Sequence, residues 1–311
     1  RYASRGLGDV YKRQDLLHNT LDNASYWYDQ RCEQPSATAP DGRGVYDCGG
    51  APEAIVVGSF DGGKSTLFAL SASKDWDTDY GSFDLFASYT HADVKDIGYG
   101  TSSTATSNYS DFAAFDRQSP REGTSNFQVE HMFKLRLNWR NELVPGYETR
   151  VSLFATRRSG QPYSYTFSEN NNCVLDVGGG RCARESRNDD AGHLLYVPNG
   201  ISDPLFSPAS FGGDVAQQQA FIDYINGSEL AQYRGGIAAR NGDNSPMSTM
   251  VDLRIQQDLP AFDADHSFRL FIDIENIGNL LNDDWGRIER TRYEYERDVV
   301  SAVINNGQYE Y

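Results

Sequence analysis

Apolar side chains recur at every second position in the segment 126–139, which reads NFQVEHMFKLRLNW. The positions between them hold all the formal charges of the segment, Glu130, Lys134 and Arg136. Successive side chains of an extended chain point to opposite faces, so this period of two puts the charges on one face and the apolar groups on the other. The segment therefore predicts a long, two-faced β-strand.

The same alternation appears in five further segments. Segment 147–157 (YETRVSLFATR) follows the first one after a short turn. The other four segments form two more pairs, each joined by a short polar turn: 66–76 with 82–92, and 248–259 with 267–276. We therefore predict an all-β chain with six strands in three antiparallel hairpins.

The connections outside the hairpins are much longer than the turns inside them. They cover about residues 15–65, 92–125, 158–247 and 283–311. The six predicted strands are long enough to cross a bilayer at a tilt. Short turns on one side with long loops on the other are typical of outer-membrane barrels. We expect a fragment of a transmembrane antiparallel β-barrel, with short periplasmic turns and long extracellular loops.

Aromatic and basic side chains fit the same interpretation. Trp76, Tyr80, Trp139 and Tyr147 cluster at the short-turn ends, where an interfacial aromatic girdle belongs. A soluble β-sandwich is the alternative, but it does not need its charges on one face, whereas a Lys or Arg facing lipid at mid-bilayer costs about 2–4 kcal/mol. Five basic residues keep to the polar positions: Lys134, Arg136, Arg150, Arg254 and Arg269.

Two residues depart from this pattern. Lys74 lies on the apolar side, but near a strand end where its ammonium group can reach the polar boundary. His131 also lies on the apolar side, and only a neutral imidazole fits there.

Several segments resemble the C-terminal barrel of Oar-like TonB-dependent outer-membrane receptors. They are GGKSTLFALSASKDW, FDLFASYTHADVKD, RRSGQPYSYTF, LAQYRGGIAARNGDNSP with DLRIQQDLP, and FRLFIDIENIGNLLNDDWG. The resemblance runs from about residue 62 to the end, in the order of that family. The run IENIGNLLNDDW resembles the end of the next-to-last strand of such barrels, so we expect the chain to stop before the closing strand.

The resemblance implies a function. Family members are 22-stranded barrels with a plug in the lumen, and they import scarce, bulky nutrients with energy passed on by the TonB complex. It implies the outer membrane of a Gram-negative bacterium, with outer-membrane lipid, the TonB complex and a small molecule, glycan or peptide as partners. The plug and the TonB-contacting box would lie upstream. A passive porin and a barrel-type surface adhesin are the alternatives.

Charged and polar residues on the non-apolar face are expected to face the lumen. Their role follows from position alone, against a plug or a substrate. They are Gln128, Glu130, Lys134, Arg136, Arg150, Asp252, Arg254 and Asp273.

The stretch GSFDGGKST (58–66) matches the phosphate-loop pattern of nucleotide hydrolases. A phosphate loop needs a helix after its Lys and Ser, with apolar residues three and four apart. Phe68, Leu70 and Ala72 instead alternate with polar and small residues, so a strand is predicted there and a hydrolase is the least favoured alternative. We expect no enzymatic activity.

The four cysteines form two local pairs, Cys32 with Cys48 and Cys173 with Cys182, each in a polar loop. Neither pair has a histidine or a further cysteine at zinc-like spacing, so two disulfides in an oxidising compartment are favoured over a metal site. The five histidines are scattered. We therefore predict no cofactor, metal site or catalytic group.

Three further features limit the interpretation. DVYKRQ (9–14) corresponds to the DNA of a transposon end used in sequencing adapters, so we expect residues 1–14 to be an artefact. The formal net charge of −16 argues against nucleic acid as a partner, because phosphate binding needs basic patches. Residues 214–233 have apolar groups near helical spacing and predict a short helix inside the longest loop.

Overall fold

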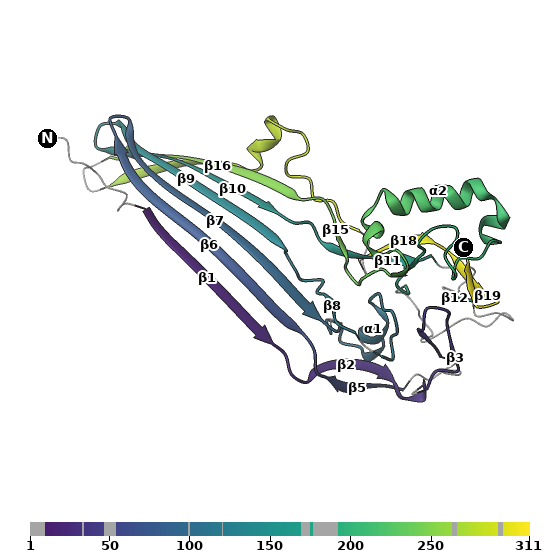
Figure 1. Ribbon diagram of the computed structural model, residues 1–311. Helices are drawn as coiled ribbons and strands as arrows, with labels where there is room; N and C mark the ends of the chain where they lie inside the picture. The colour runs from purple at the N-terminus through teal and green to yellow at the C-terminus, as the bar shows by residue number, and fades with distance from the viewer. Residues whose placement is uncertain are drawn as a thin grey trace.

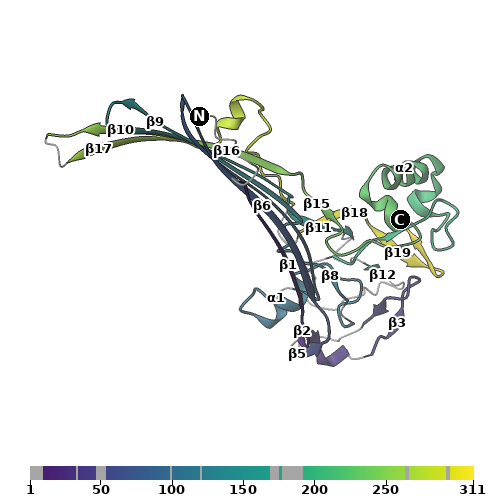
Figure 2. The same cartoon turned by 60° about the vertical axis from the view of Figure 1, so that its left-hand side comes forward.

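Long antiparallel strands build one curved sheet (Figures 1 and 2). The computed structural model describes residues 10–32, 34–46, 54–98, 100–119, 121–168, 175–176, 192–262, 266–291 and 295–311. The spatial order of the strands is β1 (Val10–Thr20), β6 (Lys64–Thr78), β7 (Gly81–Asp96), β9 (His131–Val144), β10 (Tyr147–Arg158), β16 (Ser248–Pro260) and β17 (Ser267–Ile274). The short strand β8 (Gly123–Thr124) adds to the end of β7.

The three predicted hairpins are confirmed. They are β6–β7, β9–β10 and β16–β17, and each pair is antiparallel. The turn between β6 and β7 requires glycine at position 81, where φ is +120° and a Cβ atom would lie 2.3 Å from the carbonyl oxygen of Arg140.

Strand β1 was not predicted. It covers Val10–Thr20 and pairs along its whole length with β6, so it includes residues 10–14, which the sequence analysis set aside, and the start of the expected loop 15–65. Backbone pairing explains this difference. The outer edge of β6 offers unpaired N–H and C=O groups, and an extended segment can pair with them without a marked alternation of its own.

The connections at the far end of the sheet fold together into what we call the loop layer, formed by the described parts of 21–63, 97–130, 159–247 and 295–311 (Figure 1). The sheet's hairpin turns lie at the opposite end. The N-terminal part of the loop layer holds β2 (Ala24–Asp29), η2 (Gln30–Cys32), β3 (Ala37–Thr38), β4 (Gly44–Val45), β5 (Ile55–Phe60) and α1 (Ala105–Ser110). The later part holds β11 (Pro162–Phe167), β12 (Leu175–Asp176), β13 (Tyr196–Val197), η3 (Ser210–Gly213), α2 (Val215–Asn226), η4 (Glu229–Tyr233), β14 (Gly236–Ile237) and β15 (Asp243–Asn244).

The chain returns to the loop layer after the sheet. Beyond β17, the 3-10 turn η5 (Ile277–Leu280) precedes the short strands β18 (Glu296–Val300), β19 (Ala302–Asn305) and β20 (Gln308–Glu310). Strand β18 pairs with β11 in parallel, and β19 and β20 form a small hairpin. Residues 283–311 were expected to be a connection without strands, because these strands are short and because β18 and β19 pair with the distant strands β11 and β12.

The predicted helix is confirmed as α2 followed by η4. The carboxylate of Asp214 caps α2 by accepting hydrogen bonds from the backbone N–H groups of Ala216 and Gln217, at 2.9 and 3.3 Å. One face of the helix is buried in an aromatic-rich core, where Ile225 and Leu230 have no exposed surface. Among the residues that the structure describes, no helix is long and apolar enough to cross a membrane.

Candidate functional site

The strand registers divide the side chains of the sheet into two faces. Residues directly opposite each other in adjacent strands share a face, and the pairings link Arg136 with Phe154 and Asp252, and Ser152 with Arg254 and Asp273. Six residues predicted to face a lumen therefore lie on one face, here called the polar face: Lys134, Arg136, Arg150, Asp252, Arg254 and Asp273.

Ion pairs run across the polar face. Arg254 forms a two-pronged pair with Asp273, with N–O distances of 2.5 and 2.6 Å. Arg269 pairs with Asp258 at 2.8 Å, and Arg136 pairs with Asp84 at 3.2 Å. The three arginine side chains are each more than half exposed, so the pairs contribute little to stability and leave a charged, hydrated surface.

The other two predicted lumen residues do not belong to this face. Both precede the first residue of β9, so the alternation of the strand does not fix their direction. Gln128 is buried, and its side-chain oxygen accepts a hydrogen bond from the backbone N–H of Val94 at 2.6 Å. The carboxylate of Glu130 lies beside the ring of His131 instead.

The opposite face, here called the apolar face, is exposed over most of its extent. Most of its charged side chains lie near strand ends: Lys64, Lys74, Asp93, Lys95 and Arg157. The exception is Lys12 of β1, which pairs with Ala72 near the middle of β6. Its exposed large apolar side chains come from β6, β9, β16 and β17: Phe68, Leu70, Phe133, Leu135, Ile255, Phe268, Leu270, Ile272 and Ile274. A contiguous apolar surface of this kind indicates contact with lipid or with another protein.

Aromatic residues mark the hairpin end of the apolar face. Trp76, Phe83 and Trp139 are neighbours in the register of β6, β7 and β9, and the rings of Trp76 and Phe83 stack with centroids 5.2 Å apart. The indole N–H of Trp139 donates to the carbonyl oxygen of Tyr80 at 2.7 Å. The predicted clustering of aromatic side chains at the short turns is present.

The GSFDGGKST stretch does not form a phosphate loop. Strand β5 leads into it, and β6 begins at Lys64, where a phosphate-binding loop would start a helix. The backbone N–H of Gly63 donates to a side-chain oxygen of Glu122 at 2.7 Å, an acidic partner in place of an anion. The strand predicted in place of the helix of a phosphate loop is confirmed.

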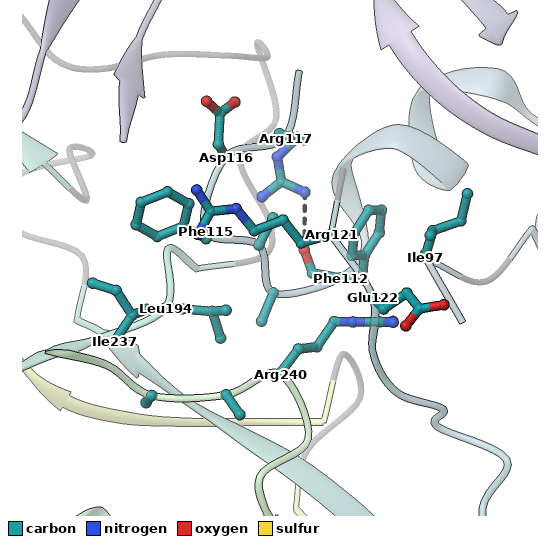
Figure 3. A pocket seen from close by; sticks show the side chains of 14 residues that line it. Ile97, Phe112, Phe115, Asp116, Arg117, Arg121, Glu122, Leu194, Ile237 and Arg240 are labelled. Atoms are coloured by element: carbon teal, nitrogen blue, oxygen red, sulfur yellow. Dashed lines mark hydrogen bonds between the residues drawn. The ribbon is translucent and has the colours of Figure 1, made fainter. Parts of the chain in front are cut away.

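A pocket of about 190 Å³ lies in the loop layer, between the β7–β9 and β10–β16 connections (Figure 3). Phe112 and Phe115 form part of its wall, and three arginines, Arg117, Arg121 and Arg240, line it. This site was not predicted from the sequence. The charges of 116–122 read as an ordinary solvated loop, and Arg240 is more than a hundred residues away in the chain.

The three arginines are held in different ways. One nitrogen of Arg117 donates to the carbonyl oxygens of Tyr109, Ser110 and Phe112 at 2.9–3.0 Å. This guanidinium therefore stabilises the fold of the β7–β9 connection. The guanidinium of Arg121 lies 3.9 Å from the centroid of the Phe115 ring. This stacking leaves its edge available to other groups.

Arg240 is buried at the junction of the pocket with the end of β7. Its Nη2 binds the carboxylate of Asp96 at 2.6 Å, while its Nη1 is buried without a hydrogen-bond partner among the described residues. A buried guanidinium nitrogen that lacks an acceptor favours an anionic or carbonyl oxygen. The pocket can therefore receive a small acidic or carbonyl-bearing group flanked by aromatic rings.

The predicted disulfides are only partly visible. Cys32 is disulfide-bonded and buried at the end of η2. Its predicted partner, Cys48, and the predicted pair Cys173 and Cys182 lie outside the described residues.

No protein-family model, no curated protein and no solved structure matches the chain.

Proposed function

We propose that this chain is part of the barrel of a TonB-dependent outer-membrane receptor, which takes up a bulky, scarce nutrient with energy from the TonB complex. The proposal combines the sequence resemblance from about residue 62 onward with the arrangement of the long strands. In this proposal the apolar face contacts lipid, the polar face lines the lumen, and the loop layer is extracellular.

One observation carries the proposal. Among the described residues, Ala92 is the only buried hydrophobic residue in the seven long strands, although these strands hold a large share of the apolar side chains. A sheet folded for water packs its apolar face against another layer. Here that face stays exposed while the charges gather on the other, as expected for a sheet whose apolar side meets hydrocarbon.

The remaining parts take roles that follow from position. The ion-paired arginines and aspartates of the polar face would give a hydrated wall for a plug or a passing substrate. The loop layer, with its arginine-lined pocket, would be the first part to meet the nutrient. The TonB complex would act through a region that precedes these strands.

Two adjacent residues of β17 allow a matched test. Ile272 and Phe271 are almost equally exposed, at 52% and 57%, and they lie on the apolar and the polar face respectively. In phosphatidylcholine vesicles, Ile272→Arg should lower the free energy of unfolding by about 2–4 kcal/mol if the residue lies near the bilayer centre. Phe271→Arg should leave it within about 0.5 kcal/mol.

The measurement is the urea midpoint of the vesicle-inserted protein, followed by tryptophan fluorescence, with flotation to quantify insertion. Equal behaviour of the two variants would contradict the lipid-facing assignment. So would a wild-type chain that stays monomeric in buffer without lipid or detergent.

A further inference from the structure

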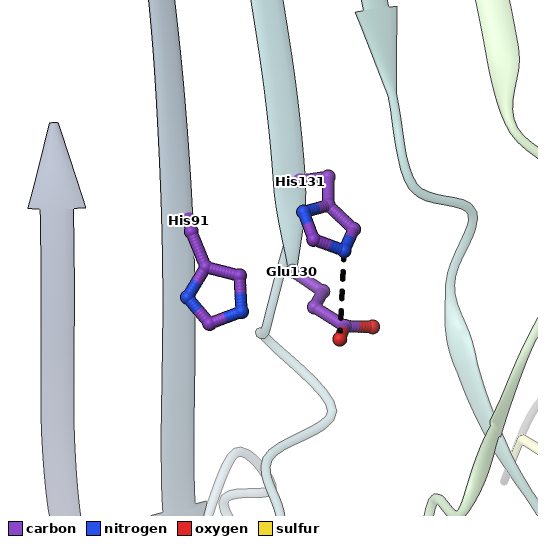
Figure 4. A group of neighbouring side chains, drawn as sticks. All are labelled: His91, Glu130 and His131. Carbon is purple, nitrogen blue, oxygen red and sulfur yellow. Dashed lines mark ion pairs between the residues drawn. The ribbon is translucent and has the colours of Figure 1, made fainter. Parts of the chain in front are cut away.

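Two histidines from neighbouring strands lie side by side on the apolar face, at its loop-layer end (Figure 4). His91 belongs to β7 and His131 begins β9, and they are direct partners in the antiparallel register. Their ring centroids are 5.1 Å apart. The register therefore unites two imidazoles that are forty positions apart in the chain.

A carboxylate completes the group. Because Glu130 precedes β9, its side chain can turn toward His131, and its Oε1 lies 3.6 Å from the Nε2 of that ring (Figure 4). One ligand atom from each of His91, Glu130 and His131 lies within 4.8 Å of the other two. All three residues are half-buried.

Two members of this group, His131 and Glu130, are held by neighbouring side chains at the nitrogen and oxygen atoms that do not face each other. The hydroxyl of Tyr89 lies 2.9 Å from the Nδ1 of His131, and the amide of Asn244 donates to the Oε2 of Glu130 at 3.0 Å. With Nδ1 donating its proton to Tyr89, Nε2 keeps its lone pair and faces Oε1 of the glutamate. Outer partners of this kind orient the ligands of metal sites.

The backbone of His131 is also fixed. Its N–H donates to the hydroxyl oxygen of Ser159 at 3.0 Å, and its carbonyl accepts from the N–H of Ser159 at 2.9 Å. His91 differs, because no side-chain hydrogen bond is made by either of its ring nitrogens within the described part of the chain. Its nitrogens are therefore available to a ligand.

We infer that His91, Glu130 and His131 bind a divalent transition-metal ion, with Zn²⁺ as the best fit. Two imidazole nitrogens and one carboxylate oxygen form a three-ligand zinc set with an open fourth position. Ligand atoms about 2.0–2.1 Å from a tetrahedral ion lie about 3.3 Å from each other. The His131–Glu130 pair at 3.6 Å is close to this spacing, and His91 reaches it by a side-chain movement of about 1–1.5 Å.

Such an ion would join β7 to the entry of β9 at the boundary between the sheet and the loop layer. It would also account for histidines at the end of an otherwise apolar face, where the sequence pattern gave no reason for them.

The test is calorimetric titration of the chelator-treated full chain with ZnCl₂ in detergent micelles. Wild type should bind one equivalent, and His91→Phe, His131→Phe and Glu130→Gln should each weaken binding at least tenfold. Phenylalanine keeps an aromatic ring on the apolar face, so these variants are expected to fold. Titration with Co²⁺ adds a second readout, because a tetrahedral site gives an intense visible absorption band that the variants should lack.

His18→Phe is the matched control. His18 lies on the same face of the sheet, but its Nδ1 is 2.9 Å from the hydroxyl of Thr66 and it has no place in the cluster. Zinc affinity should be unchanged in this variant. The inference is overturned if wild type does not bind one equivalent at zinc concentrations up to the order of 100 µM, a free energy of about −5.5 kcal/mol, or if the three cluster variants bind as wild type does. Neither outcome depends on insertion into a bilayer.

Discussion

The sheet and the loop layer bury apolar surface in opposite ways. The loop layer encloses a core of its own, in which Phe167, Leu195, Val197, Phe206 and Tyr309 are all almost completely buried. The sheet instead leaves its apolar face open and keeps its ion pairs on the surface. The loop layer is thus stabilised by a buried core as a protein in water is, whereas no described layer covers the apolar face of the sheet, which the proposed contact with lipid would do.

Tyrosine shows the same contrast. Burial raises the pKa of Tyr165, Tyr196, Tyr309 and Tyr311, all in the loop layer, and nearby carboxylates add to the effect. The hydroxyl of Tyr165 donates to the carboxylate of Asp243 at 2.6 Å, and that of Tyr196 donates to Asp203 at 3.0 Å. The loop layer thus depends on neutral, buried phenols.

The largest expected effect comes from removing a core ring of the loop layer. Phe167 is 1% exposed and stacks on Tyr309, with centroids 5.5 Å apart. Phe167→Ala should cost the loop layer about 3–5 kcal/mol, because it removes buried apolar surface and leaves a cavity. Hydrogen exchange should report faster opening of the loop layer while exchange of the long strands is unchanged.

Phe271→Ala provides the control for that substitution, because Phe271 is 57% exposed on the polar face of the sheet. It should change hydrogen exchange in neither region. If Phe167→Ala accelerated exchange equally in the sheet and the loop layer, the two regions would form one cooperative unit, and the comparison between them would fail.

Alkaline pH should destabilise the loop layer more than the sheet. The effect should be smaller than that of Phe167→Ala and should grow gradually as the pH rises. A tyrosine with a raised folded pKa stabilises the fold fully at pH values below the unfolded pKa, about 10, and the contribution is lost as pH rises toward the folded value. Each buried tyrosine can therefore cost the loop layer up to about 1.4 kcal/mol for each pH unit above 10. Hydrogen exchange of loop-layer amides, corrected for base catalysis and read beside the tyrosinate absorbance, should show the loop layer opening before the sheet.

The smallest effect is expected on the polar face. Arg254→Gln removes the pair with Asp273, but both side chains are about half exposed, so hydration and salt already weaken their attraction. The urea midpoint in vesicles should not shift measurably at physiological salt. A marked loss of stability would show that this face is packed against another structure and not hydrated.

Local patterns account for what the sequence predicted well. The alternation in 126–139 and its five counterparts is a property of neighbouring residues, so strands, hairpins and the two faces could be derived without knowing what lies beside them. The helix α2 was equally accessible, because Asp214 and the apolar residues after it lie within a few turns.

Long-range contacts account for what the sequence did not predict. Strand β1 depends on the free edge of β6, and the arginine pocket depends on two connections that meet only when the sheet is formed. His131 was an unexplained exception in the pattern. In the structure its ring lies opposite His91 of β7 and beside the carboxylate of Glu130. The register that brings His91 to this place cannot be derived from spacing along the chain.

The sequence by itself thus determined six of the seven long strands, their pairing within hairpins and the separation of charge from apolar surface, because these follow from the pleat of an extended backbone. Only the tertiary structure decided which side chains from distant segments meet, since that depends on register between hairpins and on where the long connections fold back. The histidine–glutamate cluster and the arginine pocket are both products of that second step.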